Sequence, residues 1–276
     1  MDFSKNFEAR GLTPGKAVSA DPTRFRGHRG GVISMHRALA HFHLGPMNLL
    51  AATSLFLFFS SVWLFLLARV CRFWQSVLEA GLRYLPLRAE LALSEHRITP
   101  ALRFDVPYFR MEPVLPTPAM WWLTCAVTVL LFAATFFLSK KWIPVVYLLR
   151  AVLLVQVSAL LYFMLMPARF PHTPESYLEG LTSSGAALIT AVPLLFGLVY
   201  YIFDFGLLKK AALTSLTMLY LTLFLPFQIL LQSVILQKTV LFMPLLYIVF
   251  GMPLDILLII AFYSWGMTWE FRKRGS

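Results

Sequence analysis

Charged side chains are scarce in this chain. Lys, Arg, Asp and Glu together make up 13% of its 276 residues, whereas soluble domains carry about 25%. Hydrophobic residues make up 59%, above the roughly 45–50% of soluble domains. This balance excludes an ordinary water-soluble domain and indicates a chain whose apolar side chains face lipid.

Cysteine is almost missing as well. The chain has two cysteines, Cys71 and Cys125, so a disulfide framework is excluded. His36, His41 and His43 lie close together, but their spacings of five and two do not fit the i, i+4 pair of a helical metal site. We therefore predict no metal site and no cofactor.

Catalytic motifs are missing too. A serine–histidine dyad at Ser184 is excluded on the spans that follow, because no histidine occurs after it. His172 lies near Glu175 and Glu179, yet no nucleophile stands at a defined spacing from them. The sequence thus argues against an enzyme, although a lipid-modifying enzyme with sparse motifs stays open.

Long apolar stretches are what the chain does have. Each is about as long as the roughly 20 residues that a helix needs to cross the bilayer core. They are residues 47–67, 119–138, 142–166, 182–205, 211–236 and 240–268. We therefore predict an all-α membrane protein, a bundle of six transmembrane helices with an amphipathic extracytoplasmic segment between helices 1 and 2.

The organisation along the chain follows from these stretches. The predicted parts are a disordered basic cytoplasmic tail (1–31), an interfacial helix (32–46), the first span (47–70), the extracytoplasmic segment (71–118), the remaining five helices (119–268) and a second basic cytoplasmic tail (269–276).

Basic residues predict the orientation. Lys140 and Lys141 follow the second stretch, Lys209 and Lys210 follow the fourth, and both chain ends are basic. Six alternating spans place all of them on one side, which the positive-inside rule makes the cytoplasm. We predict a multi-pass protein of the inner cell membrane with both termini cytoplasmic, although an organellar membrane stays open.

The net charge of +11 has a simple explanation in this setting. Basic residues beside membrane spans attract anionic lipid headgroups, so we predict such lipids as partners and no nucleic acid.

The long segment between the first two spans is a second source of predictions. Its first part has apolar residues at helical spacing and predicts an amphipathic helix on the outer surface, interrupted near Pro86. Charged and aromatic residues then alternate at Arg103, Asp105, Tyr108 and Arg110. They predict a short strand or a strip that docks a protein partner or a lipid headgroup; a simple lid over the bundle is the alternative.

Two charges fall deep inside predicted spans, where each needs a physical reason. Arg150 lies eight residues after Trp142, about 12 Å along a helix, and Asp255 lies ten residues before Trp265, about 15 Å. Their similar depths allow an ion pair between them. Further polar residues of the spans are Asp204, Gln156, Gln228 and Gln232.

Asp255 also follows Gly251 and Pro253, where we predict a helix break. A carboxylate beside a broken helix is how many transporters build a site at mid-membrane, whereas a structural clamp between Arg150 and Asp255 is the simpler hypothesis. Few polar groups line the spans. The leading hypothesis for the function is therefore a non-catalytic component that anchors or assembles a membrane or envelope complex. The alternative is a small transporter or channel.

Overall fold

The computed structural model describes residues 24–26, 32–34, 46–99, 102–139, 142–202 and 206–271. Two short strands, β1 (Arg24–Arg26) and β2 (Val32–Ser34), pair in antiparallel fashion. The predicted helix over 32–46 is therefore wrong at its start, where backbone pairing with residues 24–26 holds the chain extended. Residues 35–45, Lys140, Lys141, Asp204 and 272–276 lie outside the described residues.

Helices make up most of the described chain, and one hairpin of two strands interrupts them. The helices are α3 (Pro46–Tyr84), α4 (Pro118–Ala134), α5 (Ile143–Leu165), α6 (Pro174–Ile202), α7 (Leu207–Leu236), α8 (Met243–Phe250) and α9 (Met252–Phe271), with 3₁₀ turns η2 (Pro167–Arg169) and η3 (Val240–Phe242). The hairpin pairs β3 (Glu90–Thr99) with β4 (Leu102–Arg110).

Five of the described segments are long and apolar enough to cross a membrane. They are Leu49–Tyr84, Ile143–Leu165, Pro174–Tyr200, Leu207–Leu236 and Val240–Gly266, the last of which contains the break between α8 and α9. The predicted second span is shorter: α4 has 17 residues, or about 25 Å. The chain thus has the makeup of a multi-pass membrane protein, with five such spans described rather than six.

The end of α4 has a local cause. The backbone N–H of Thr135 is shared between the carbonyls of Leu131 and Phe132, and its hydroxyl donates to Phe132 as well. Such tightening of the last turn ends a helix. The next two residues continue as turns, so the apolar run to Leu138 is not one helix.

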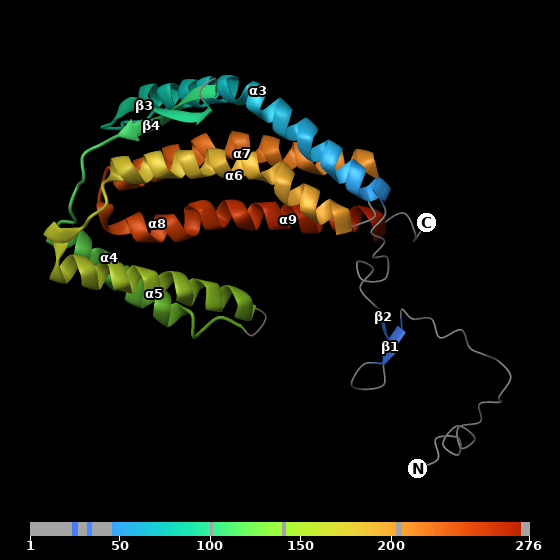
Figure 1. Ribbon diagram of the computed structural model, residues 1–276. Helices are drawn as coiled ribbons and strands as arrows, with labels where there is room; N and C mark the ends of the chain where they lie inside the picture. Colours follow the sequence, from blue (N-terminus) through green and yellow to red (C-terminus); the bar gives the residue numbers. More distant parts are fainter. Residues whose placement is uncertain are drawn as a thin grey trace, which may run out of the picture.

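The helices lie roughly parallel to one axis and reverse direction one after another (Figure 1). The start of α3, the end of α6, the start of α7 and the end of α9 lie at one end of the bundle, while the β3–β4 hairpin lies at the other. Helix direction thus alternates from α3 through α4, α5, α6 and α7 to the α8–α9 pair.

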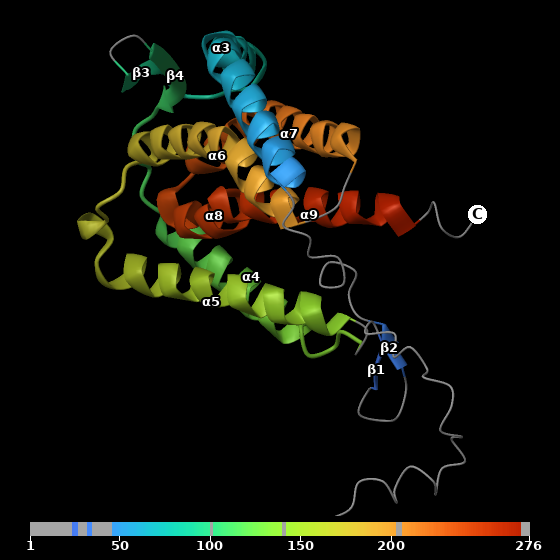
Figure 2. The same ribbon diagram turned by 45° about the vertical axis from the view of Figure 1, so that its right-hand side comes forward.

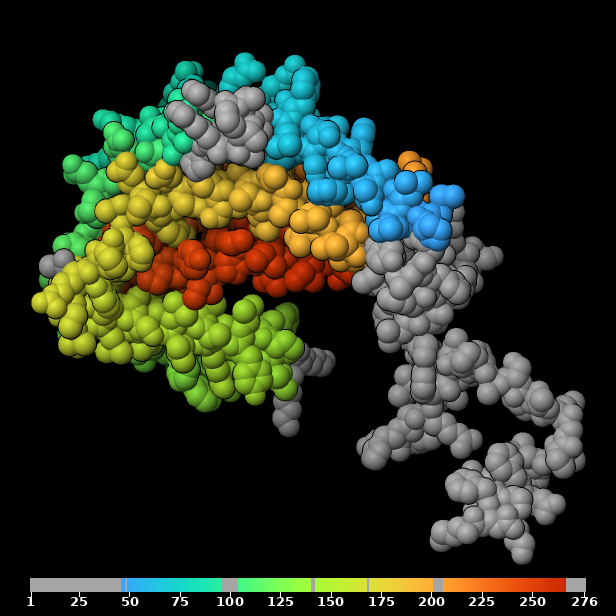
Figure 3. Space-filling model, in the orientation of Figure 1, coloured from blue at the N-terminus to red at the C-terminus, as the bar shows by residue number. Residues whose placement is uncertain are grey.

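The helices form layers that both ribbon views show (Figures 1 and 2). The α4–α5 pair packs on α8 and η3, and α9 packs on α6 and α7. On the far side of α6 and α7 lies α3, with β4 packed on both α3 and α6. The space-filling view shows the same order from α5 to α3 (Figure 3).

The prediction of a separate amphipathic helix on the outer surface is wrong. α3 is one helix of 39 residues, so residues 71–84 continue the first span instead of forming a separate helix on the membrane surface. It ends at Tyr84, two residues before Pro86. The all-α prediction also misses the β3–β4 hairpin, although the strand predicted over 103–110 is confirmed as part of β4.

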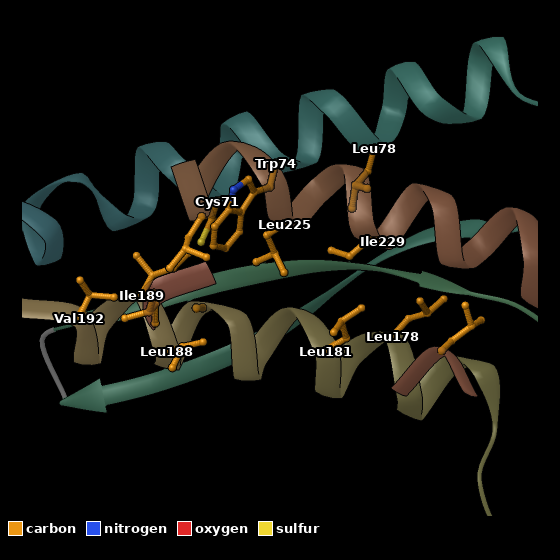
Figure 4. Packing of buried hydrophobic residues seen from close by; sticks show 14 of the residues in the cluster. Cys71, Trp74, Leu78, Leu178, Leu181, Leu188, Ile189, Val192, Leu225 and Ile229 are labelled. Carbon is orange, nitrogen blue, oxygen red and sulfur yellow. The ribbon is translucent and has the colours of Figure 1, made fainter. Parts of the chain in front are cut away.

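Packing in the core explains why α3 continues past residue 70. Trp74 is fully buried and its indole N–H donates to the Thr222 carbonyl of α7 at 2.8 Å. Around it, apolar side chains of α3, α6 and α7 meet (Figure 4). The labelled ones include Cys71, Leu78, Leu178, Leu181, Ile189, Leu225 and Ile229. This packing holds the second half of α3 against the bundle.

Candidate functional site at the break between two helices

The helix break predicted at Gly251 and Pro253 is present between α8 and α9. In a continuous helix the N–H of Leu254 would donate to the carbonyl of Phe250. Here it donates to the carbonyl of Gly251 at 3.0 Å, and Pro253 has no N–H to offer. The Phe250 carbonyl is therefore released from the helical hydrogen-bond pattern.

Two glutamines of α7 take up this free carbonyl. Gln232 donates to Phe250 O at 2.7 Å, and Gln228, one turn earlier, donates to it at 3.3 Å. The same Nε2 of Gln228 lies 2.9 Å from Oδ1 of Asp255. Gln228, Gln232, Asp255 and the helix break, which are distant in sequence, thus form one polar cluster.

Tyr177 extends the cluster to a third helix. From the first turns of α6 its hydroxyl donates to Oε1 of Gln232 at 2.5 Å. Its ring packs edge-on against Tyr247, which is exposed. The hydrogen-bonded groups therefore run from a half-buried tyrosine near the hairpin end of the bundle to the carboxyl group of Asp255.

The inner part of the cluster is buried. Gln232 is fully buried, and Gln228 and Asp255 are 2% and 4% exposed. Beside Asp255 the packing leaves no space that a water molecule could occupy. The surrounding residues from α6 and α7 carry no charge: Gly185, Leu188, Ile189, Leu221 and Leu225.

The cluster leaves two polar features unbalanced. No side chain of the described residues forms an ion pair with Asp255, whose hydrogen-bond partner is Gln228. Oε1 of Gln228 is buried with no hydrogen-bond partner among the described residues. A buried polar atom without a partner is costly, so this site is a functional candidate.

The predicted pair of Arg150 and Asp255 is not formed. Nε of Arg150 donates to the Thr135 hydroxyl at 3.0 Å, and its guanidinium lies over the ring of Phe136 at 4.6 Å. Both partners come from the α4–α5 side of the molecule, whereas Asp255 faces α6 and α7. Equal depth along two helices says nothing about whether those helices are neighbours, which is why the prediction failed.

A double-mutant cycle tests this separation. Because Arg150 and Asp255 share no partner, the effects of Arg150→Gln and Asp255→Asn on the free energy of unfolding should add to within about 0.5 kcal/mol. Chemical unfolding in detergent of the wild type, both single variants and the double variant measures the coupling. A buried ion pair would instead give a coupling of several kcal/mol.

Glycine is required at position 251 by close approach. A Cβ there would collide with the backbone carbonyl oxygen of Tyr247, which has no rotamer by which to move aside. We expect Gly251→Ala to lower the free energy of unfolding by about 1–3 kcal/mol, measured by thermal or chemical unfolding in detergent.

Gly180 of α6 is the matched control, since a Cβ there meets nothing within 4 Å. Gly180→Ala should be neutral or stabilising by up to about 1 kcal/mol, because alanine loses less backbone entropy in a helix. Equal losses from both substitutions would contradict the packing described at the break.

Two residues of the predicted docking strip, Tyr108 and Arg110, form contacts within the chain. Tyr108 is buried and lies 3.4 Å from Glu175, and Arg110 pairs with the same carboxylate at 2.9 Å. The bond to Glu175 raises the pKa of the Arg110 guanidinium above its ordinary value. Asp105 is exposed, and the side chain of Arg103 lies outside the described part. Tyr108 and Arg110 thus fasten the hairpin to α6.

A polar hollow of about 730 Å³ lies beside this attachment. Its wall carries charges of both signs, contributed by residues after α3, at the start of β3, at and after the end of β4, and in the first turn of α6. The charged side chains are Arg88, Glu90, Arg110, Glu112 and Glu175. No local sequence pattern predicts the hollow, because it forms between segments that are far apart in the chain.

Gln156 lies apart from the cluster on α5. It is 4% exposed, and neither atom of its amide has a hydrogen-bond partner in the described chain. The predicted site residues thus divide: Gln228, Gln232, Gly251, Pro253 and Asp255 come together, while Arg150 and Gln156 belong to the α4–α5 pair. Sequence reasoning missed Tyr177 and the Phe250 carbonyl, since an ordinary tyrosine and a backbone group carry no local signal.

Comparison with protein-family models, with curated proteins and with solved structures finds no match to this chain.

Proposed function

We propose that this protein is a small membrane transporter or channel whose ion site is the cluster at the α8–α9 break. One observation carries the proposal: a buried carboxyl group, Asp255, stands beside a backbone carbonyl freed by the break and an amide oxygen that has no donor among the described residues. Polar groups gathered at an interrupted helix are the arrangement by which transporters bind ions within the bilayer.

The chemistry of the cluster favours a small cation. A net negative charge buried without a basic partner is strongly unfavourable, and Asp255 has no such partner among the described residues. A proton or a monovalent cation would remove that cost. The apolar packing around the carboxyl group leaves no room for a larger solute in this conformation.

The proposal includes a membrane topology. With α4 as the shortest of six crossings, both chain ends and the lysine pairs fall on one side, which the positive-inside rule makes the cytoplasm. The hairpin then lies on the outer side of the inner cell membrane, and the basic chain ends contact anionic lipid headgroups.

Ion flux tests the proposed function. The purified protein is reconstituted into liposomes that contain a pH-sensitive or cation-sensitive dye, and gradients of H⁺, Na⁺ or K⁺ are imposed one at a time. Transport of one of these ions above the rate in protein-free liposomes supports the proposal. Rates equal to those of protein-free liposomes under all three gradients overturn it.

Assembly of a membrane complex is the second candidate, and the outer hollow favours it. A polar cavity of about 730 Å³ beside the hairpin is large enough for a segment of a protein partner. Mild-detergent purification of the intact protein separates the two functions. A stoichiometric companion protein supports assembly, whereas a monodisperse bundle that transports ions supports the first proposal.

A further inference from the structure

We infer that Asp255 and Gln228 form a proton-binding pair. In this conformation the carboxyl group of Asp255 is neutral, and its O–H donates a hydrogen bond to Oε1 of Gln228. The inference rests on the proposed function, since it names the ion that the site takes.

The first argument is the hydrogen-bond balance of Gln228. Its Nε2 donates to Asp255 and to Phe250, so both of its N–H bonds are used. Its Oε1 is buried and has no donor among the described residues. The carboxyl group is the neighbour already bonded to this amide, and a proton on its second oxygen supplies the donor that Oε1 lacks.

An ionised Asp255 would leave Oε1 of Gln228 without a donor. The carboxylate has acceptor oxygens only, so it offers nothing to Oε1 of Gln228. A neutral carboxylic acid beside a carboxamide instead gives two parallel hydrogen bonds, N–H to Oδ1 and O–H to Oε1.

Among the described residues that line the space beside Asp255, none would compensate a negative charge. The elements packed around it present apolar side chains and one backbone carbonyl. α6 offers Gly185, Leu188 and Ile189, α7 offers Leu221 and Leu225 beside Gln228, and α8 ends at the Phe250 carbonyl. None of these carries a titratable side chain.

A metal cation is disfavoured by the same packing. Na⁺ and K⁺ need several oxygen ligands around them, but the Phe250 carbonyl already accepts hydrogen bonds from Gln228 and Gln232. The space beside Asp255 does not admit a water molecule that could complete a coordination shell. A proton needs neither room nor further ligands.

Infrared difference spectroscopy of the full chain in lipid tests the pair. We expect the carbonyl-stretching band of a neutral carboxylic acid at neutral pH, absent in Asp255→Asn and retained in Asp105→Asn, whose carboxyl group is exposed. In Gln228→Leu the band should move to higher frequency, because the carboxyl group loses its amide partner. Adding NaCl or KCl should leave the wild-type band in place.

Two outcomes would overturn the inference: no neutral-acid band that depends on Asp255, or loss of that band when Na⁺ or K⁺ is added. These outcomes are separate from the flux measurement. If the band is missing while the protein still transports a cation, the proton pair is wrong and the transport proposal stands. If the band is present and no ion crosses the liposome membrane, the pair stands and transport is wrong.

Discussion

Asp255→Asn should reduce ion flux to the level of protein-free liposomes while the protein stays folded. Asparagine has the shape of a protonated aspartate, so its Oδ1 can accept from Nε2 of Gln228 and its Nδ2 can donate to Oε1, the atom that now lacks a donor. The amide satisfies the cluster without releasing or binding a proton. A melting temperature within about 4 °C of the wild type, the shift that about 1 kcal/mol produces in a chain of this size, should accompany the loss of flux.

Asp105→Asn is the control for this variant, because Asp105 is exposed on the hairpin and lies outside the cluster. It should transport at the wild-type rate. If Asp255→Asn transports as well as the control, the carboxyl group has no part in transport. If Asp255→Asn unfolds on extraction, the group holds the bundle together, which is the role that a structural clamp would have.

Trp74→Ala should be the most destabilising single change in the described core. The side chain is fully buried between α3 and α7, and its indole N–H satisfies the Thr222 carbonyl at 2.8 Å. Removing it leaves a cavity and an unpaired acceptor, and such truncations lower the free energy of unfolding by about 3–5 kcal/mol. Chemical unfolding of the purified protein in detergent measures the loss.

The preceding residue supplies the matched control. Phe73 is 39% exposed, so Phe73→Ala removes an aromatic ring of the same helix without opening the core, and we expect a change of less than about 1 kcal/mol. A comparable loss from both variants would mean that the second half of α3 is not held by the packing in Figure 4.

The long spans could be predicted from the sequence because crossing a bilayer depends on local length and apolarity alone. Five of them are described as such. The end of α4 at Ala134 was missed because hydropathy does not detect the tightened turn at Thr135. The continuation of α3 to Tyr84 was missed for a different reason: Trp74 contacts α7, and the sequence does not say which helices are neighbours.

For the site too, the sequence does not show which helices are neighbours. Gln228, Gln232, Gly251 and Asp255 were each recognisable from the sequence as polar or breaking residues within apolar spans. Their meeting depends on the rotation of α7 relative to the break, which is set by packing across the bundle. The predicted ion pair between Arg150 and Asp255 is wrong for this reason. The depth of Arg150 matches that of Asp255, but its helix lies beside α4 and α8.

Gly251 separates two sets of helix contacts. Before it, α8 and η3 contact α5 as well as α7, and after it α9 contacts α6 and α7. Gln228 and Gln232 tie the end of α8 to α7 through the Phe250 carbonyl. A tilt of α8 away from α7 would therefore have to break these two hydrogen bonds.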